Sequence, residues 1–227
     1  MLARQDHVGP AMASPRSGAS VAAQPRFGGA FPQASDVALA LLYGLFALAH
    51  IRLARETGRW LELLPLVVQE TLLVVLFISR RPASRTSRRV SDWVVAVLGT
   101  FLPLLLLAHD RPAALAPLGT LLQGLGLAVA LAALATLGRS IGVVAADRGI
   151  KTGGPYRVVR HPAYAGYLLT YTGFVLSYPS LWNTLVTLAT AICLVGRVFA
   201  EERHLAATLA YRAYQRRVRW RLLPGVC

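Results

Sequence analysis

Long apolar segments, separated by short stretches rich in arginine, dominate the sequence. Hydrophobic residues make up 55% of the 227 residues, and the mean hydropathy of +0.51 is too high for an ordinary soluble domain. A helix needs about 20 apolar residues to cross the hydrocarbon core of a bilayer, and several segments approach or reach that length. The apolar segments are residues 36–53, 61–79, 93–108, 117–137, 163–178 and 181–199.

This pattern predicts an all-α integral membrane protein with about six transmembrane helices, in a range of about five to seven because two segments are short. Only Pro179 and Ser180 separate the last two segments, so we expect them to form a C-terminal helical hairpin. Residues 1–35 are rich in Ala, Gly, Pro, Ser and Gln and are predicted to be a disordered leader. N-terminal transmembrane helices would then occupy residues 36–136, and a separate C-terminal region residues 137–227.

The formal net charge of +14 raises the question of nucleic-acid binding. The basic residues, however, lie between the apolar segments. With the N-terminus inside and alternating helices, 20 of the 24 arginines and lysines fall on the inner side. Membrane proteins concentrate these residues in cytoplasmic loops, so the charge needs no nucleic acid. We expect an integral protein of a bacterial inner (plasma) membrane. Arg52, Arg55 and Arg59 fit this topology least well, because it places them outside.

Neither the cysteines nor the histidines show the spacing of a metal site. Cys193 lies inside an apolar segment, Cys227 is the last residue, and no histidine has a second ligand nearby in the sequence. We therefore predict no metal and no disulfide. The chain also lacks a GxGxxG motif, which excludes a Rossmann-type nucleotide site.

One polar stretch, GPYRVVRHPAYAG at residues 154–166, interrupts the apolar pattern. Pro162 suits the first turn of a helix, which places His161 at the entrance of the helix that follows. Free backbone N–H groups at that entrance, together with Arg160 and His161, would bind a carboxylate or a phosphate. Tyr156 and Tyr164 offer aromatic faces and hydroxyl groups. The simpler alternative is that these residues only anchor the helix at the depth of the lipid headgroups.

A second polar cluster, GRVFAEERHL at residues 196–205, ends the last apolar segment. Arg197 and Glu201 are four residues apart on one helix face, so a surface ion pair is one explanation. Acidic residues are scarce in this chain, however, ten in all, and carboxylates at a membrane boundary are usually functional. Because a hairpin returns to the side where it began, we expect this cluster to lie beside the 154–166 stretch.

Together the two clusters would place cations and N–H groups on one wall of a site and carboxylates on the other. That arrangement suits a zwitterion with an amino and a carboxylate group, and the tyrosines offer faces for an aromatic ring or a cation. S-adenosylmethionine has all of these features.

The motifs GPYRVVRHPAYAGYLL and EERHLAATLAYRAYQRRVRWRLLPG, in this order, resemble the C-terminal catalytic region of the isoprenylcysteine carboxyl methyltransferase and phospholipid methyltransferase superfamily. The resemblance covers roughly residues 137–224. It implies an α-helical membrane enzyme that binds S-adenosylmethionine from the cytoplasmic side and takes a lipidic or apolar acceptor from the bilayer. Residues 137–227 would then be a methyltransferase-like catalytic region.

The resemblance also implies roles for individual residues. Contacts to S-adenosylmethionine would come from Arg148, Gly149, Ile150, Lys151, Tyr156, His161, Pro162, Ala163, Tyr164 and Glu201. Within this set, Glu201 would hold the amino group of the cofactor. The predicted catalytic residues are Arg197, Arg160 and Glu202. Arg197 would face the carboxylate or headgroup of the acceptor, and Glu202 or a tyrosine could help remove a proton if the acceptor is an amine.

Two other functions remain open. A sterol-reductase-like enzyme would use NADPH, and that group also carries an RHPxY-type turn and a tyrosine-rich C-terminal helix. A membrane scaffold would use the same motifs only to anchor its helices. For a methyltransferase, the acceptor could be a prenylated cysteine, a phospholipid amine, or a small apolar thiol or acid.

Overall fold

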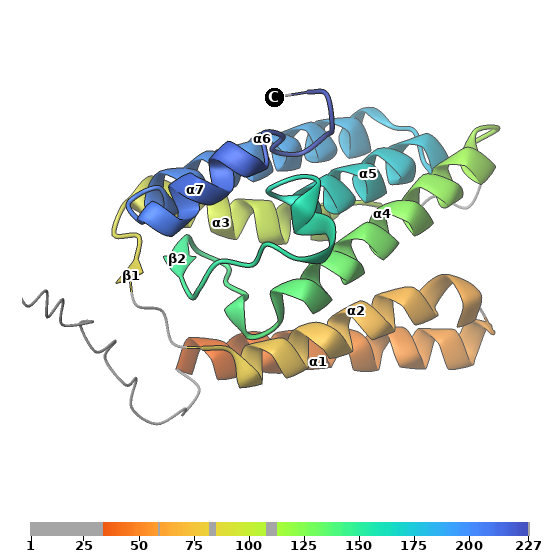
Figure 1. Ribbon diagram of the computed structural model, residues 1–227. Helices are drawn as coiled ribbons and strands as arrows, with labels where there is room; N and C mark the ends of the chain where they lie inside the picture. Colours follow the sequence, from red (N-terminus) through yellow and green to blue (C-terminus); the bar gives the residue numbers. More distant parts are fainter. Residues whose placement is uncertain (1–33, 59, 82–84, 108–112, 227) are drawn as a thin grey trace, which may run out of the picture.

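The computed structural model describes residues 34–58, 60–81, 85–107 and 113–226 (Figure 1). The α-helices are α1 (Ala34–Thr57), α2 (Trp60–Ser79), α3 (Val90–Phe101), α4 (Ala116–Leu137), α5 (Pro162–Ser177), α6 (Leu181–Leu205) and α7 (Leu209–Arg217). The 3-10 helices are η1 (Leu102–Leu105), η2 (Gly138–Ser140) and η3 (Gly154–Arg157). The predicted leader lies outside the described residues, except that residues 34 and 35 begin α1.

Each of the six apolar segments forms a helix, so the predicted all-α class is confirmed for the described residues. The described residues also contain an antiparallel pair of two-residue strands, β1 (Arg85–Thr86) and β2 (Ala146–Asp147), and two isolated β-bridges. Within the described ranges, three helical stretches are long and apolar enough to cross a membrane, namely Asp36–Thr57, Ala116–Ser140 and Leu181–Leu205. Two shorter apolar stretches are Leu66–Ser79 and Val90–Leu105. The number of crossings, about six, stays a prediction.

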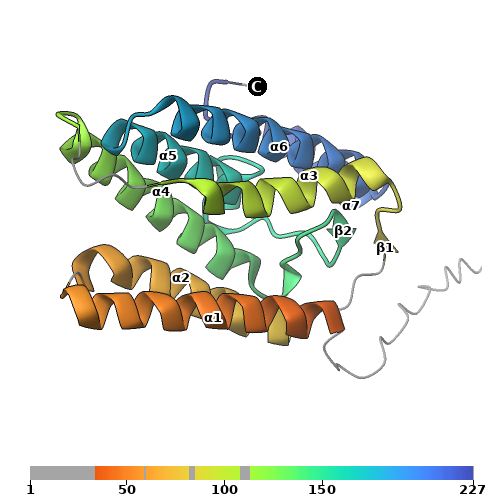
Figure 2. The ribbon, with the colours of Figure 1, turned by 180° about the vertical axis from the view of Figure 1, so that it is seen from behind.

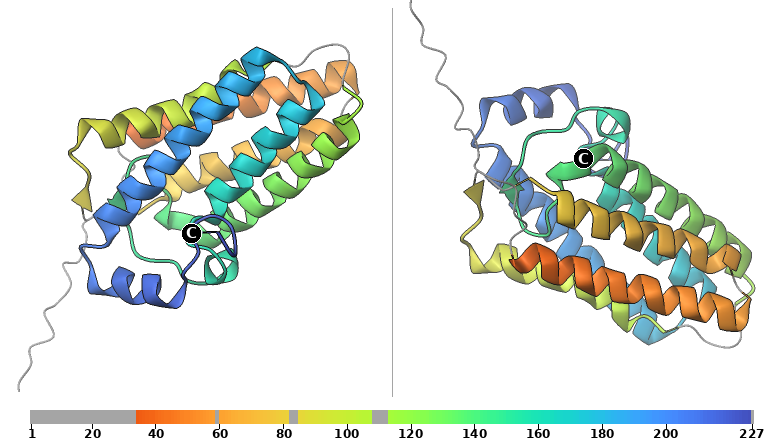
Figure 3. Two further views of the ribbon diagram at one scale, coloured as in Figure 1. Left: turned by 90° about the horizontal axis from the view of Figure 1, so that it is seen from above. Right: turned by 90° about the horizontal axis from the view of Figure 1, so that it is seen from below.

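The helices associate in three pairs: α1 with α2, α3 with α6, and α4 with α5. Figure 1 shows the α1–α2 hairpin as a separate layer beneath the other helices, and Figure 2 shows α3 running along α6. The views in Figure 3 confirm that α1 and α2 lie side by side. The predicted C-terminal hairpin is present, because only three residues separate α5 from α6, but each of its helices packs mainly on an earlier helix.

Glycines allow α4 and α5 to pack closely. A Cβ atom on Gly166 of α5 would lie 2.6 Å from the carbonyl oxygen of Gly126 and 2.7 Å from the nitrogen of Ala130, both on α4. One end of the pair repeats this arrangement, since a Cβ on Gly119 would lie 2.5 Å from the carbonyl oxygen of Gly173. Small residues let membrane helices approach in this way. The contact fixes the position of α5 and of the polar residues at its start.

The turn between α5 and α6 is fixed by hydrogen bonds. The Ser180 side chain caps α6 by accepting from the backbone N–H of Asn183 at 3.0 Å. The fully buried Asn183 side chain donates to the carbonyl oxygens of Tyr178 at 2.8 Å and Leu107 at 2.9 Å. The start of α5 and the end of α6 therefore return to the same end of the bundle, where α7, β1 and β2 also lie (Figure 1).

Candidate active site

A cavity of about 430 Å³ is lined by residues from all seven α-helices and from the segment between α4 and α5. This volume lies within the usual range for small-molecule sites, about 300–1,000 Å³. Polar residues of α5, α6, α7 and the α4–α5 segment line one part of the cavity. The α1–α2 hairpin and α4 add apolar residues, among them Leu42, Phe46, Leu73, Phe77 and Leu134. The cavity therefore suits a ligand with a polar part and an apolar part.

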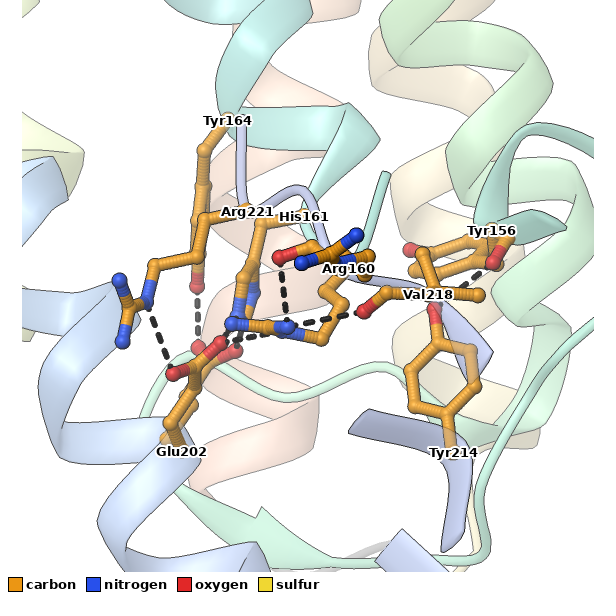
Figure 4. A network of polar contacts seen from close by, with 10 residues as sticks. Tyr156, Arg160, His161, Tyr164, Glu202, Tyr214, Val218 and Arg221 are labelled. Carbon is orange, nitrogen blue, oxygen red and sulfur yellow. Dashed lines mark hydrogen bonds and ion pairs between the residues drawn. The ribbon is translucent and has the colours of Figure 1, made fainter. Parts of the chain in front are cut away.

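His161 and Tyr164 form part of the polar wall (Figure 4). His161 immediately precedes α5, and its ring stacks on that of Tyr164 with centroids 5.8 Å apart and an interplanar angle of 9°. The Tyr164 hydroxyl donates a hydrogen bond to Glu201 of α6. The Nδ1 atom of His161 lies 3.7 Å from Oε2 of the same carboxylate. The start of α5 and the end of α6 thus meet as their hairpin connection predicts.

Glu202 is at the centre of a separate network (Figure 4). Its carboxylate accepts hydrogen bonds from Nε of Arg160 at 2.6 Å and Nε of Arg221 at 3.0 Å, and Nε2 of His161 lies 3.4 Å away. Nη1 of Arg160 also donates to the carbonyl oxygens of Val218 at 2.8 Å and Arg219 at 3.0 Å. Glu202 does not line the cavity. This network joins the two residues before α5, the end of α6 and the chain after α7.

Arg197 is a buried cation inside the cavity wall, with only 8% of its surface exposed. Its Nη1 donates to the Thr100 hydroxyl at 3.2 Å and its Nη2 to the carbonyl oxygen of Val143 at 2.9 Å. The guanidinium lies over the Tyr164 ring, 4.9 Å from its centroid. The Nε atom is buried without a partner, and no carboxylate of the described residues lies within 4.0 Å of the guanidinium.

The ion pair between Arg197 and Glu201 that their spacing allows is therefore absent from the structure. Glu201 instead accepts from Tyr164. Glu201 interacts with Arg197 electrostatically but forms no ion pair with it. A buried charge without an ion-pair partner is costly, so Arg197 has the properties of a site for an anionic ligand.

Tyrosines of α7 and η3 close the polar end of the cavity. The Tyr214 hydroxyl donates to the carbonyl oxygen of Tyr156 at 2.8 Å, whereas the buried Tyr211 hydroxyl has no partner in the described part of the chain. Burial raises the pKa of Tyr156 and of Tyr211, and it raises the pKa of Tyr214 to about 12. These side chains are therefore neutral near pH 7 and offer aromatic faces and hydrogen-bond donors.

The basic segment from Arg148 to Lys151 lines the same part of the cavity. Nε of Arg148 donates to the carbonyl oxygen of Arg81 at 3.1 Å, and burial lowers the pKa of this guanidinium. Gly149 has a φ of +91°, a conformation that favours glycine, and its N–H donates to the Asp147 side chain at 3.2 Å. The β1–β2 pair holds this segment beside the end of α6.

The structure brings most of the predicted site residues together in one cavity. Its lining includes nine of the ten predicted cofactor contacts: Arg148, Gly149, Ile150, Lys151, Tyr156, His161, Ala163, Tyr164 and Glu201. Pro162 is buried at the first position of α5 and does not line the cavity. Of the predicted catalytic residues, Arg197 and Arg160 line it and Glu202 does not. The roles of these residues stay predictions.

Several cavity residues were not among the predicted ones. Tyr167 and Tyr171 lie on the same face of α5 as Tyr164, and this helical spacing was a signal for both. Glu70 of α2 faces the cavity with His50 of α1. Glu70 could have been predicted as a functional residue, because it is an acidic residue in the middle of an apolar segment.

Comparison with known proteins finds one similarity, in the C-terminal half of the chain. A family model described as phospholipid methyltransferase matches residues 115–212, which run from just before α4 into α7. No curated protein and no solved structure matches the chain. The matched region contains the glycine-packed helix pair, the His161–Tyr164–Glu201 cluster and Arg197. Over residues 115–212, the chain is therefore similar to the phospholipid methyltransferases, a family of membrane methyltransferases, as its sequence motifs predict.

Proposed function

We propose that the protein transfers a methyl group from S-adenosylmethionine to an apolar carboxylate, such as that of an isoprenylcysteine-like compound. The main support is Arg197, a buried cation in the cavity wall that has no carboxylate partner among the described residues. An anionic acceptor would supply the missing charge, and the apolar lining contributed by the α1–α2 hairpin would hold its hydrocarbon part.

The polar end of the cavity fits S-adenosylmethionine, which would supply an electrophilic methyl group on its sulfonium. Glu201 can accept hydrogen bonds from the amino group, and the Arg148–Lys151 segment can bind the carboxylate. The unpaired Tyr211 hydroxyl is a buried donor that a bound ligand would satisfy. Tyr156, Tyr211 and Tyr214 supply aromatic surface for the adenine ring.

Arg197 would orient the acceptor for the reaction. Thr100 and Val143 hold its guanidinium in place, so a carboxylate bound there would have a fixed position. A carboxylate nucleophile has no proton to lose and needs no general base. The remaining task of the protein is to position both reactants and exclude water, which the rings of Tyr164, Tyr167 and Tyr171 support.

The geometry favours a positioning role for Glu202 over proton removal. Its carboxylate is held by Arg160 and Arg221 and does not line the cavity. In addition, the positive charge of Arg197 would repel a protonated amine. Both observations favour a carboxylate over a phospholipid amine as the acceptor.

We further propose that the polar end of the cavity faces the cytoplasm from a bacterial plasma membrane. The segment between α4 and α5 and the residues from Arg197 onward together hold half of the arginines and lysines, and these segments line the polar end. Such an excess of basic residues is typical of cytoplasmic loops.

Thermal unfolding of the purified protein tests the cofactor. S-adenosylhomocysteine is expected to raise Tm, because it binds only the folded state, and NADPH is not. The reverse result would favour a reductase, and no shift with either compound would favour a scaffold.

A labelling assay tests the acceptor. Membranes are incubated with methyl-labelled S-adenosylmethionine and extracted into lipid, protein and volatile fractions. Label in a carboxyl ester is the expected result, and label on a phospholipid amine would contradict it.

A further inference from the structure

The cavity has a second polar part, made by the α1–α2 hairpin. His50 of α1 and Glu70 of α2 line it, and Nδ1 of His50 lies 3.0 Å from the Glu70 carboxylate. Gln69 lies beside them in the lining. Only 8% of the Glu70 surface is exposed. None of these residues lies within residues 115–212, where the family model matches.

Apolar surface separates this pair from Arg197. Tyr43 of α1 lines the cavity and interacts electrostatically with both Arg197 and Glu70, so it is near both charged groups. His50 is about two turns beyond Tyr43 on the same helix, which corresponds to about 10 Å along the axis. Phe46 and Leu73 line the cavity between them. A ligand bound to Arg197 would thus extend through an apolar passage before it meets the His50–Glu70 pair.

The free atom of the pair is Nε2 of His50. Glu70 occupies Nδ1, and Nε2 has no hydrogen-bond partner in the described portion of the chain. Nε2 carries a lone pair or an N–H group, depending on the tautomer. A hydroxyl group can both donate and accept, so it satisfies Nε2 in either case.

Joining α1 to α2 would be a simpler role for the pair. The hairpin, however, is already held by apolar contacts of Leu39–Tyr43 with Leu72–Phe77 and by the ion pair between Arg80 and Asp36. A pair with only that role has no reason to face a cavity, and an acidic side chain within a membrane segment is costly. The position of the pair in the cavity lining is better explained by a ligand.

We propose that the His50–Glu70 pair binds a hydroxyl group at the far end of the methyl acceptor, which would make the acceptor an apolar hydroxy acid. The proposal that the carboxylate of the acceptor binds Arg197 rests on the proposed function. The proposal that its hydroxyl group binds the His50–Glu70 pair is inferred only from residues of the α1–α2 hairpin.

Equilibrium binding to the full-length protein in detergent tests the proposal. The probes are radiolabelled ω-hydroxy fatty acids of increasing length, each compared with the unsubstituted acid of the same length. At the best length, the protein is expected to bind the hydroxy acid about tenfold more tightly. In His50→Phe the ratio is expected to fall to near one, with the affinity for the unsubstituted acid unchanged.

Glu56→Gln is the matched control, because Glu56 is an exposed residue of α1 outside the cavity lining. This variant should keep the preference for the hydroxy acid. If His50→Phe does not fold, His50→Ala takes its place, and S-adenosylhomocysteine binding reports on the rest of the site. Equal affinity for both acids at every length, or an unchanged preference in the His50 variant, would overturn the proposal. Failure of the wild-type protein to bind S-adenosylhomocysteine would instead contradict the proposed function.

Discussion

At the scale of single residues, Arg197 is the most informative side chain. Two of its nitrogens donate hydrogen bonds to Thr100 and Val143, its guanidinium lies over the Tyr164 ring, and it has no carboxylate partner in the described ranges. Its helical spacing from Glu201 suggested a surface ion pair. The prediction was wrong because the Glu201 carboxylate accepts a hydrogen bond from Tyr164 instead, a contact that sequence spacing cannot show. The partners of Arg197 lie 97 and 54 positions away in the sequence, so they could not be predicted.

Substitution of Arg197 should impair binding of the acceptor and leave the cofactor bound. Arg197→Gln is expected to lower kcat/KM by about 100-fold, because removing one partner of a buried charge pair costs about 2–5 kcal/mol. Arg197→Lys keeps the charge but loses the planar fork, so its kcat/KM should be intermediate. Steady-state kinetics and titration with S-adenosylhomocysteine measure the two effects. Equal activity of wild type and Arg197→Gln would exclude the assignment.

Glu201 and Glu202 are adjacent but should respond differently to substitution. Glu201→Ala is expected to abolish binding of S-adenosylhomocysteine, because Glu201 is the carboxylate of this pair that lines the cavity. Isothermal titration in detergent measures this affinity. An unchanged affinity would refute a role for Glu201 in holding the cofactor.

Glu202→Gln should chiefly reduce stability. The variant removes a buried charge that is bonded to two arginines, a loss worth about 3 kcal/mol or more. Tm is therefore expected to fall by several degrees, while KM for the acceptor changes little. A Glu202 variant with normal Tm and no turnover would restore the proton-removing role predicted from the sequence.

At the scale of helices, apolar segment length predicted the positions of the described helices well. The connection between α5 and α6 also predicted that the two polar clusters meet, since a hairpin returns to the side where it began. The positions of Tyr211 and Tyr214 could not be predicted in this way. They depend on contacts of α7 and the following residues with Arg160 and Tyr156, which are far away in the sequence.

The α4–α5 contact gives a prediction with an internal control. A methyl group on Gly166 would lie 2.6 Å from a backbone oxygen of α4, whereas one on Gly124 would meet no atom within 4 Å. Gly166→Ala is expected to lower the stability by about 1–3 kcal/mol and to reduce turnover, because α5 carries Tyr164. Gly124→Ala should match wild type. Thermal unfolding of both variants tests this difference, and equal Tm values would contradict the packing.

At the scale of the whole molecule, the cavity combines two parts of the chain. The family model matches residues 115–212, and the α1–α2 hairpin, outside that match, adds Tyr43, His50 and Glu70 to the same cavity. The apolar sequence of α1 and α2 predicted only that they are helices. Their contribution to the cavity depends on packing between distant segments, which hydrophobic periodicity does not specify.

The orientation in the membrane can be measured with single cysteines. In a chain whose two cysteines are replaced by alanine, Glu56→Cys should react with a membrane-impermeant maleimide on intact cells. Arg88→Cys should react only after the membrane is opened. The opposite pattern would place the polar end of the cavity outside the cytoplasm.

The most direct test of the account is the chemical form of the transferred methyl group. Membranes containing the wild-type protein are incubated with methyl-labelled S-adenosylmethionine, and the lipid extract is treated with mild base. We predict label that is released as methanol and that is strongly reduced with Arg197→Gln. Base-stable label on an amine, or no label above that of membranes lacking the protein, would contradict the account.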